Sequence, residues 1–311
     1  MRKAILLIII IVLTAFASTT SVAAPATTTD AGVMFGGQWF EVNESGSSTV
    51  NLSEMAPIVE VYTATWCSNC VDVEHALENI ENVTGLQQYH IHRAINEAQD
   101  PLGSINVDQR FHDRYGVLAP PVVVVNGSMI KLGSVTDEDS LESEFTDLIQ
   151  LNPLDIAGIS SFTWNLTSNN TATATWALEP QNLPLPDAGS LSAYAWIVEH
   201  SANFEEGTNG LGDYPHVVRT IVELGEIDLA STPVVASGSL NITFQDTFDQ
   251  MAYDGNDLSV HLIYQFNLPA EDEEPEQESP PLIDSPKEGL PATSLLASLC
   301  VVFGAALIRR D

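Results

Sequence analysis

The sequence predicts an α/β domain followed by an all-β domain, between an N-terminal export signal and a C-terminal transmembrane helix. Strand and helix patterns alternate over residues 34–151, whereas residues 155–268 carry strand patterns without a convincing helix. Each end of the chain holds an apolar run beside basic residues. These three observations define the expected plan of the chain.

The N-terminus has the form of a secretory signal peptide. Arg2 and Lys3 precede an apolar run, and small residues follow up to Ala24. We expect cleavage after Ala23, because a cut one residue later would place Pro25 directly behind the bond. An uncleaved N-terminal anchor is the alternative. Residues 1–23 are therefore assigned to the signal, and the rest of the chain is expected to leave the cytoplasm.

The C-terminus has the form of a membrane anchor. Residues 269–289 are acidic and rich in proline, which predicts an extended stalk. Residues 290–308 carry no charge and approach the length of a transmembrane helix, and Arg309 and Arg310 follow. We expect a cell-surface protein with its N-terminus outside and its C-terminus in the cytoplasm. This end also resembles the sorting segments of archaeal and bacterial surface proteins, in which the span can be replaced by a lipid.

The net charge of the chain argues against anionic partners. The chain has 10 Lys and Arg against 42 Asp and Glu, a formal net charge of −32. Such a surface repels nucleic acid and anionic lipid headgroups, so neither is expected to bind the exported part.

The α/β region shows its elements in order. A β-branched run predicts a strand over residues 58–64, and apolar residues at helical spacing predict a helix behind Cys70 that ends at Gly85. A strand over 89–94 and a helix over 105–115 follow. A hairpin then joins 122–125 to 128–132 through an Asn-Gly turn. A last helix, capped by Thr136 and Asp139, presents an apolar stripe of Leu141, Phe145, Leu148 and Ile149.

The second region predicts a β-sandwich. Apolar and polar residues alternate over 172–178 and 258–266, and three more strand-like runs lie between Gly-, Pro- and Asn-rich breaks. These three runs cover residues 191–199, 216–224 and 240–244.

Cys67 and Cys70 are the candidate chemical pair. The chain has three cysteines, and Cys300 lies inside the predicted span. A zinc site would need two further ligands, which His75, His90 and His92 could supply only by coincidence, so we expect no metal and no other cofactor. At the start of a helix, N–H groups and the helix dipole stabilise a thiolate. Cys67 would then be exposed and attack a client disulfide, and Cys70 would resolve the mixed disulfide.

Two motifs resemble the thioredoxin superfamily. Val61-Tyr-Thr-Ala-Thr-Trp-Cys-Ser-Asn-Cys70 is similar to its active-site segment, and Tyr115-Gly-Val-Leu-Ala-Pro-Pro121 is similar to its cis-proline segment. The resemblance implies an α/β thioredoxin-like fold, a cis Pro121 that faces the cysteines, and a substrate groove shaped by Trp66, Pro120 and Pro121. It also implies exported protein thiols or disulfides as clients, with an unidentified redox partner.

Three features depart from that family's pattern. The position of its buried acid is Val61, and Glu60 should point to the opposite face of the strand. Pro120, before the cis-proline, has no N–H to offer a substrate. Asp72 and Glu74 lie close to the cysteines and should oppose a thiolate. The direction of electron flow stays open.

The β-rich region has a looser resemblance. Residues 194–200, 214–219 and Gly225 resemble a family of secreted proteins, with outer-membrane members, that join a thioredoxin-like domain to a β-domain. His200, His216 and Arg219 could form a site, although packing is the simpler interpretation. His90 and His92 share a strand face and are expected to be structural.

The leading hypothesis is thus a membrane-anchored, cell-surface thiol–disulfide oxidoreductase. The alternative is a non-enzymatic surface protein. In it the thioredoxin-like module has a binding or structural role, and Cys67–Cys70 is a resting disulfide without redox activity. A thiol-based chaperone for metal or haem maturation is a third possibility.

Overall fold

The structure is a computed structural model that describes residues 23–116, 119–151, 153–169, 171–186, 189–230, 235–243 and 257–268. These residues belong to one compact unit, Met1–Pro269. Residues 1–22 of the expected signal, the stalk and the expected span over 290–308 lie outside the described residues. No helix in the described ranges is both long and apolar enough to cross a membrane.

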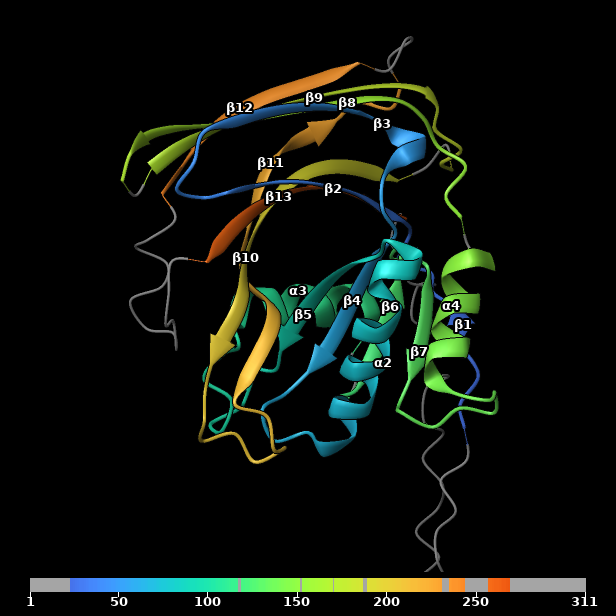
Figure 1. The fold of residues 1–311 in the computed structure, drawn as a ribbon. Coiled ribbons are helices and arrows are strands. Elements are labelled where there is room, and N and C mark those ends of the chain that lie inside the picture. Colours follow the sequence, from blue (N-terminus) through green and yellow to red (C-terminus); the bar gives the residue numbers. More distant parts are fainter. Residues whose placement is uncertain are drawn as a thin grey trace, which may run out of the picture. The chain divides into compact units, whose positions relative to one another are not determined.

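The strands of the described residues form two sheets (Figure 1). The larger sheet has nine strands in the order β1-β7-β6-β4-β5-β11-β10-β13-β2. Its strands are β1 (Thr27–Thr28), β2 (Met34–Glu41), β4 (Ile58–Thr63), β5 (Gln87–His92), β6 (Val122–Val125), β7 (Met129–Leu132), β10 (Ser190–Asn203), β11 (Asp213–Ile227) and β13 (Leu258–Asn267). The smaller sheet, in the order β12-β9-β8-β3, comprises β3 (Gly46–Asn51), β8 (Ala157–Ser168), β9 (Thr171–Asn182) and β12 (Ala236–Thr243).

Three α-helices cover the two faces of the larger sheet where the cysteines lie. Val59 and Val61 of β4 pack against α2 (Ser68–Thr84) and α4 (Leu141–Leu151). Ile58 and Tyr62 pack on the other face, against α3 (Ile105–Tyr115). Successive side chains of a strand point to opposite faces, so this short, wholly buried strand supports helices on both sides.

A second core joins the smaller sheet to the larger one. Trp164 and Trp176 of the smaller sheet are buried with Leu191, Leu262 and Tyr264 of β10 and β13. Two strands that precede β4 contribute to this core region: β2 lies in the larger sheet and β3 in the smaller one. A short 3₁₀ helix, η1 (Leu52–Glu54), follows β3. The two-layer β region is therefore built partly from the N-terminal part of the chain.

The expected α/β and all-β regions share one sheet. Strand β5 pairs in parallel with β11 through His90 and Val217, which joins residues 34–151 to 155–268 without a break in the sheet. The β10–β11 hairpin can therefore reach the end of the molecule where α2 begins (Figure 1).

Most elements follow the predicted order, with one clear correction. Gly85 ends α2 in the left-handed conformation, and Asn126 and Gly127 take the positive φ angles of 50° and 71° that their turn requires. The expected cap of α4 is wrong, because its side-chain cap is Ser140, whose Oγ accepts the N–H of Ser143 at 3.2 Å. Thr136 instead accepts the N–H of Glu138 within the preceding loop.

Candidate functional site

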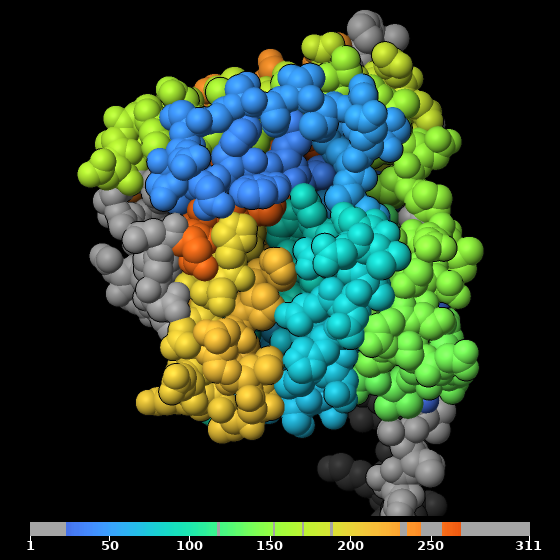
Figure 2. Space-filling model, in the orientation of Figure 1, coloured from blue at the N-terminus to red at the C-terminus, as the bar shows by residue number. Residues whose placement is uncertain are grey.

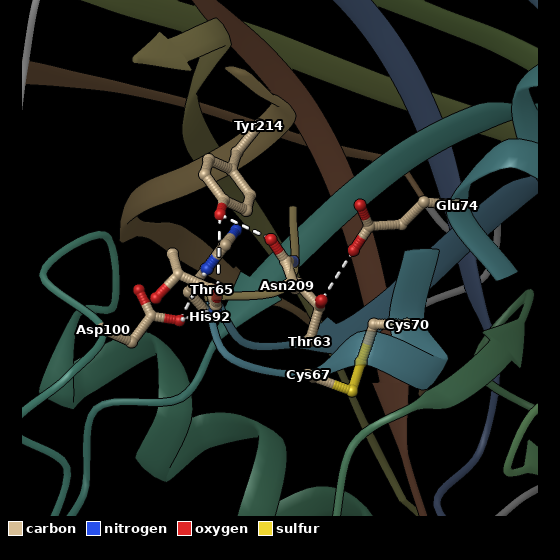
Figure 3. Close-up of a disulfide and its surroundings, with 9 residues drawn as sticks. All are labelled: Thr63, Thr65, Cys67, Cys70, Glu74, His92, Asp100, Asn209 and Tyr214. Atoms are coloured by element: carbon tan, nitrogen blue, oxygen red, sulfur yellow. Dashed lines mark hydrogen bonds and ion pairs between the residues drawn. A yellow bond between two sulfur atoms is a disulfide. The ribbon is translucent and has the colours of Figure 1, made fainter. Parts of the chain in front are cut away.

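A disulfide joins Cys67 and Cys70 where β4 gives way to α2 (Figure 3). Cys67 is the N-cap residue of the helix, and Cys70 lies in its first turn. The N–H of Cys67 donates to Ala64 at 2.9 Å, which turns the chain sharply into the helix. The first turn of α2 has N–H groups without helical partners, so the site can stabilise a thiolate at Cys67.

Both sulfur-bearing residues are buried, which corrects the expected exposure of Cys67. Cys67 is 5% exposed and Cys70 is fully covered. The pair packs with Ala64 and Trp66, while Ser68 and Asn69 between the cysteines face solvent. Cys67 thus remains the more accessible of the two, through a small part of its surface.

Trp66 is fixed beside the disulfide by a carboxylate. Its indole N–H donates to Oε2 of Glu97 at 3.0 Å, and Oε1 of Glu97 accepts the N–H groups of Ala98 and Gln99 at 2.7 Å each. Burial works to raise the pKa of Glu97, but these hydrogen bonds outweigh it and lower the pKa. Glu97 is therefore an anchored anion at neutral pH.

The Pro120–Pro121 peptide bond is cis, as the resemblance implies. Pro121 is buried and immediately precedes β6, whose Val122 pairs with Tyr62 near the end of β4. The register therefore places Pro121 at the edge where the chain leaves β4 for Cys67. Residues 117 and 118, just before it, lie outside the described residues.

The acidic residues near the site divide between two faces. Val61 packs among the apolar residues under α2, and Glu60 binds Arg110 and Tyr115 on the α3 side, as its place in the strand predicts. Asp72 is exposed, whereas Glu74 is buried and accepts the hydroxyl of Thr63 at 2.6 Å. Burial raises the pKa of Glu74, which disfavours its charged form and weakens its expected opposition to a thiolate.

A buried imidazole–carboxylate pair lies behind the loop that carries the cysteines. Nδ1 of His92 is 2.8 Å from Oδ2 of Asp100, and both side chains are fully covered. Asp100 also accepts the N–H groups of Thr65 at 2.9 Å and Leu102 at 3.0 Å. His92 therefore helps to hold the backbone just before the cysteines, in agreement with the structural part expected of it.

The β10–β11 hairpin supplies residues that the sequence did not assign to the site. The carbonyl of Thr65 accepts the N–H groups of Thr208 at 3.0 Å and Asn209 at 3.1 Å. The hydroxyl of Tyr214 lies 3.4 Å from the same carbonyl and donates to Asn209 at 2.8 Å (Figure 3). Tyr214 and Thr65 are 149 residues apart in the chain, so no local pattern could have revealed the contact.

The remaining candidates do not join into one site. His200 and His216 line a separate pocket of about 490 Å³ together with His261, whereas Arg219 is buried in an ion pair with Glu199. Burial lowers the pKa of His216 to about 4 and that of His261 to about 3, so both are neutral at pH 7. Within the described ranges, no group of three or more His, Cys, Asp or Glu is arranged to hold a metal ion.

Comparisons with known proteins give low-identity structural neighbours. No protein family and no curated protein matches the sequence. Among solved structures, HBP35 of Porphyromonas gingivalis is similar at 16% identity with a TM-score of 0.46, over 67% of this chain and 68% of that one. Protein AGR_C_4864 from Agrobacterium tumefaciens is similar at 14% identity with a TM-score of 0.39, over 59% of this chain and 77% of that one. Both TM-scores lie below 0.5, so neither likeness carries an argument about this chain, whose mixed α/β structure with a large sheet is seen directly.

Proposed function

We propose that this protein is an extracytoplasmic, membrane-anchored thiol–disulfide oxidoreductase that acts on exported proteins through the Cys67–Cys70 couple. The observation that carries the proposal is the position of this disulfide at the first turn of α2. Helix N–H groups there favour the thiolate that the reaction needs. The cis Pro121 at the neighbouring strand end and the fixed Trp66 further support it.

The chemistry is two successive exchanges. A client thiolate attacks the sulfur of Cys67, the Cys67–Cys70 bond breaks, and Cys70 leaves as a thiolate. A second client thiolate attacks the client sulfur of the mixed disulfide, and Cys67 leaves in turn. The client gains one disulfide, the pair gains two electrons, and its thiolates take up protons from water. The reverse order reduces a client, and a redox partner, which is unidentified, restores the starting state.

The finer fold assignment is part of the same proposal. The succession β4–α2–β5–α3–β6–β7–α4, with helices on both faces, supports a thioredoxin-like unit over residues 34–151. The two packed β layers support a β-sandwich that residues 155–268 form together with β2 and β3. The signal peptide and the helix over 290–308 would place this unit outside the membrane.

The reduction potential of the couple tests the proposal. The full-length Cys300→Ser chain leaves Cys67 and Cys70 as its only cysteines and is equilibrated with glutathione buffers. We expect a value between about −120 and −270 mV, the range of thioredoxin-fold catalysts. In an insulin-reduction or refolding assay, Cys67→Ser should abolish the activity. Equal activity of the variant and the parent chain would contradict the proposal.

A resting disulfide in a binding or structural module is the second candidate. It is favoured by the burial of the bridge, since Cys67 is 5% exposed and Cys70 is fully covered. In that case the potential should lie well below about −300 mV, as it does for structural disulfides.

A further inference from the structure

A groove of about 410 Å³ lies beside the disulfide and is not used by the chemistry proposed above. Three segments line it: Thr65 and Trp66 before α2, Ala98, Gln99 and Pro101 after β5, and the loop that joins β10 to β11. Trp66 directly precedes Cys67 and packs against Cys67 and Cys70, so a molecule that touches its ring contacts a residue that adjoins the disulfide.

The wall supplied by the β10–β11 loop is a fixed part of the fold. Thr208 and Asn209 donate to the carbonyl of Thr65, and the N–H of Phe204 donates to Gly212 at 2.8 Å across the base of the loop. The loop also approaches closely at Gly207, where an added Cβ would lie 2.0 Å from the hydroxyl of Tyr214. Figure 2 shows the hairpin packed beside the first turns of α2. A ligand would therefore find this wall already in place.

The lining combines aromatic and acidic groups. Trp66 and Phe204 are both partly exposed, and Pro101 is exposed between the segments. Two aromatic rings offer a large, rigid contact area for an apolar side chain. Glu206 lies in the same lining and faces solvent.

The charge around the groove is negative. Glu205 and Glu206 are exposed on the loop, and Glu97 holds Trp66 from the other side. Nε of Arg93 lies 4.0 Å from Oε2 of Glu97. Glu206 is the charged residue among those that line the groove, in a chain whose formal net charge is −32. Such a field attracts cationic segments and repels anionic ones.

From these observations we infer that the groove binds the part of a client polypeptide next to its reacting cysteine, and that it selects a segment with an apolar side chain and a lysine or arginine. The apolar side chain lies against Trp66 and Phe204, and the cation lies near Glu206. This inference rests on the proposed function and adds the class of client to it.

Paired peptides test the selectivity. One peptide carries a single cysteine, a leucine and two lysines, and its partner has two glutamates in place of the lysines. The readout is the rate at which each reduced peptide opens the Cys67–Cys70 bridge of the full-length Cys300→Ser chain at low salt, with reduced glutathione as a small thiol. We expect the lysine peptide to react at least fivefold faster than the glutamate peptide, and the difference to shrink in high salt.

Variants locate the effect in the groove. Glu206→Lys should reduce or reverse the preference, and Phe204→Ala should slow the lysine peptide severalfold more than it slows glutathione. Glu179→Gln and Leu240→Ala, which alter exposed residues of the smaller sheet, are matched controls that should change neither rate. If Glu206→Lys leaves the preference intact, or if Phe204→Ala slows peptide and glutathione equally, the inference is wrong.

A cysteine-free version of the lysine peptide separates this inference from the proposed function. Its binding to the oxidised chain requires the groove but no exchange chemistry. Binding without reaction of any thiol would contradict the oxidoreductase proposal and support the groove. Reaction with thiols without a peptide preference would support the oxidoreductase proposal and overturn the inference.

Discussion

Glu74 is a buried carboxyl group on the helix that carries the disulfide, four residues after Cys70 and therefore on the same helical face. One of its oxygens accepts the hydroxyl of Thr63, and within the described residues the other oxygen has no hydrogen-bond partner. Burial raises its pKa, although Thr63 and His92 work in the opposite direction. Ionising Glu74 therefore costs folding free energy.

Glu74→Gln should stabilise the protein at neutral and alkaline pH. A carboxyl group whose folded-state pKa is raised binds more protons in the folded than in the unfolded state, so its contribution is full below the unfolded-state pKa and is lost as the pH rises. Glutamine can still accept from Thr63 and does not ionise. We expect a higher free energy of unfolding for the variant at pH 8, because the parent must there either bury a charged carboxylate or take up a proton on folding.

The measurement is urea unfolding of variant and parent at pH 4 and pH 8. The gain should be smaller at pH 4, because the parent side chain becomes protonated in both states as the pH falls towards and below the unfolded-state pKa. An equal difference at the two pH values would contradict the role of ionisation.

The β10–β11 hairpin is the element that connects the β-rich part of the chain to the redox site. Its loop hydrogen-bonds to Thr65, two residues before Cys67, and it forms one wall of the groove. These contacts depend on the close approach at Gly207, because any side chain there would meet Tyr214. The glycines of this hairpin should therefore differ in whether they tolerate a side chain.

Gly207→Ala should detach the loop, whereas Gly212→Ala should not. The added Cβ lies 2.0 Å from the Tyr214 hydroxyl at the first position, while at the second the closest atom is 3.9 Å away. Overpacking of this kind typically costs about 1–3 kcal/mol. Denaturant unfolding measures the loss of stability, and hydrogen exchange should be faster at the amides of Thr208 and Asn209 in the first variant alone. Equal effects of the two substitutions would refute the contact.

The nine-stranded sheet makes the described part of the molecule one unit. A buried ion pair reinforces the connection, because Arg219 of β11 binds Glu199 of β10 and also donates to the carbonyl of Leu102, beyond β5, at 2.9 Å. Both charged side chains are fully covered. Removing one partner would leave the other charge buried in a poorly polarisable interior.

Arg219→Met should therefore cost about 3–5 kcal/mol, and the double change with Glu199→Leu should recover much of that loss. Because the sheet is continuous, we expect one unfolding transition. Hydrogen exchange measured along a denaturant titration should then give the same unfolding midpoint for the amides of β4 and β6 as for those of β8 and β9. Two separate midpoints would show that the α/β and β-rich regions fold independently.

The sequence by itself determined the elements around the cysteines and the chemical pair. A β-branched run, a helical apolar stripe and the Asn-Gly turn are local signals, so β4, α2 and the β6–β7 hairpin could be placed from residues near each other in the chain. Cys67 and Cys70 followed as the pair at the helix start. Strand β8 is not among the predicted strands, although Phe162, Trp164 and Leu166 alternate there with polar residues.

Tertiary structure alone decided what surrounds that pair. The burial of Cys67, the binding of the β10–β11 loop to Thr65, and the sharing of one sheet by both regions all join segments far apart in the chain. Periodicity shows which face of an element is apolar, but not which distant element covers that face. Tertiary packing determines that partner. Here it buries the local cysteine motif and places a groove with an acidic residue beside it.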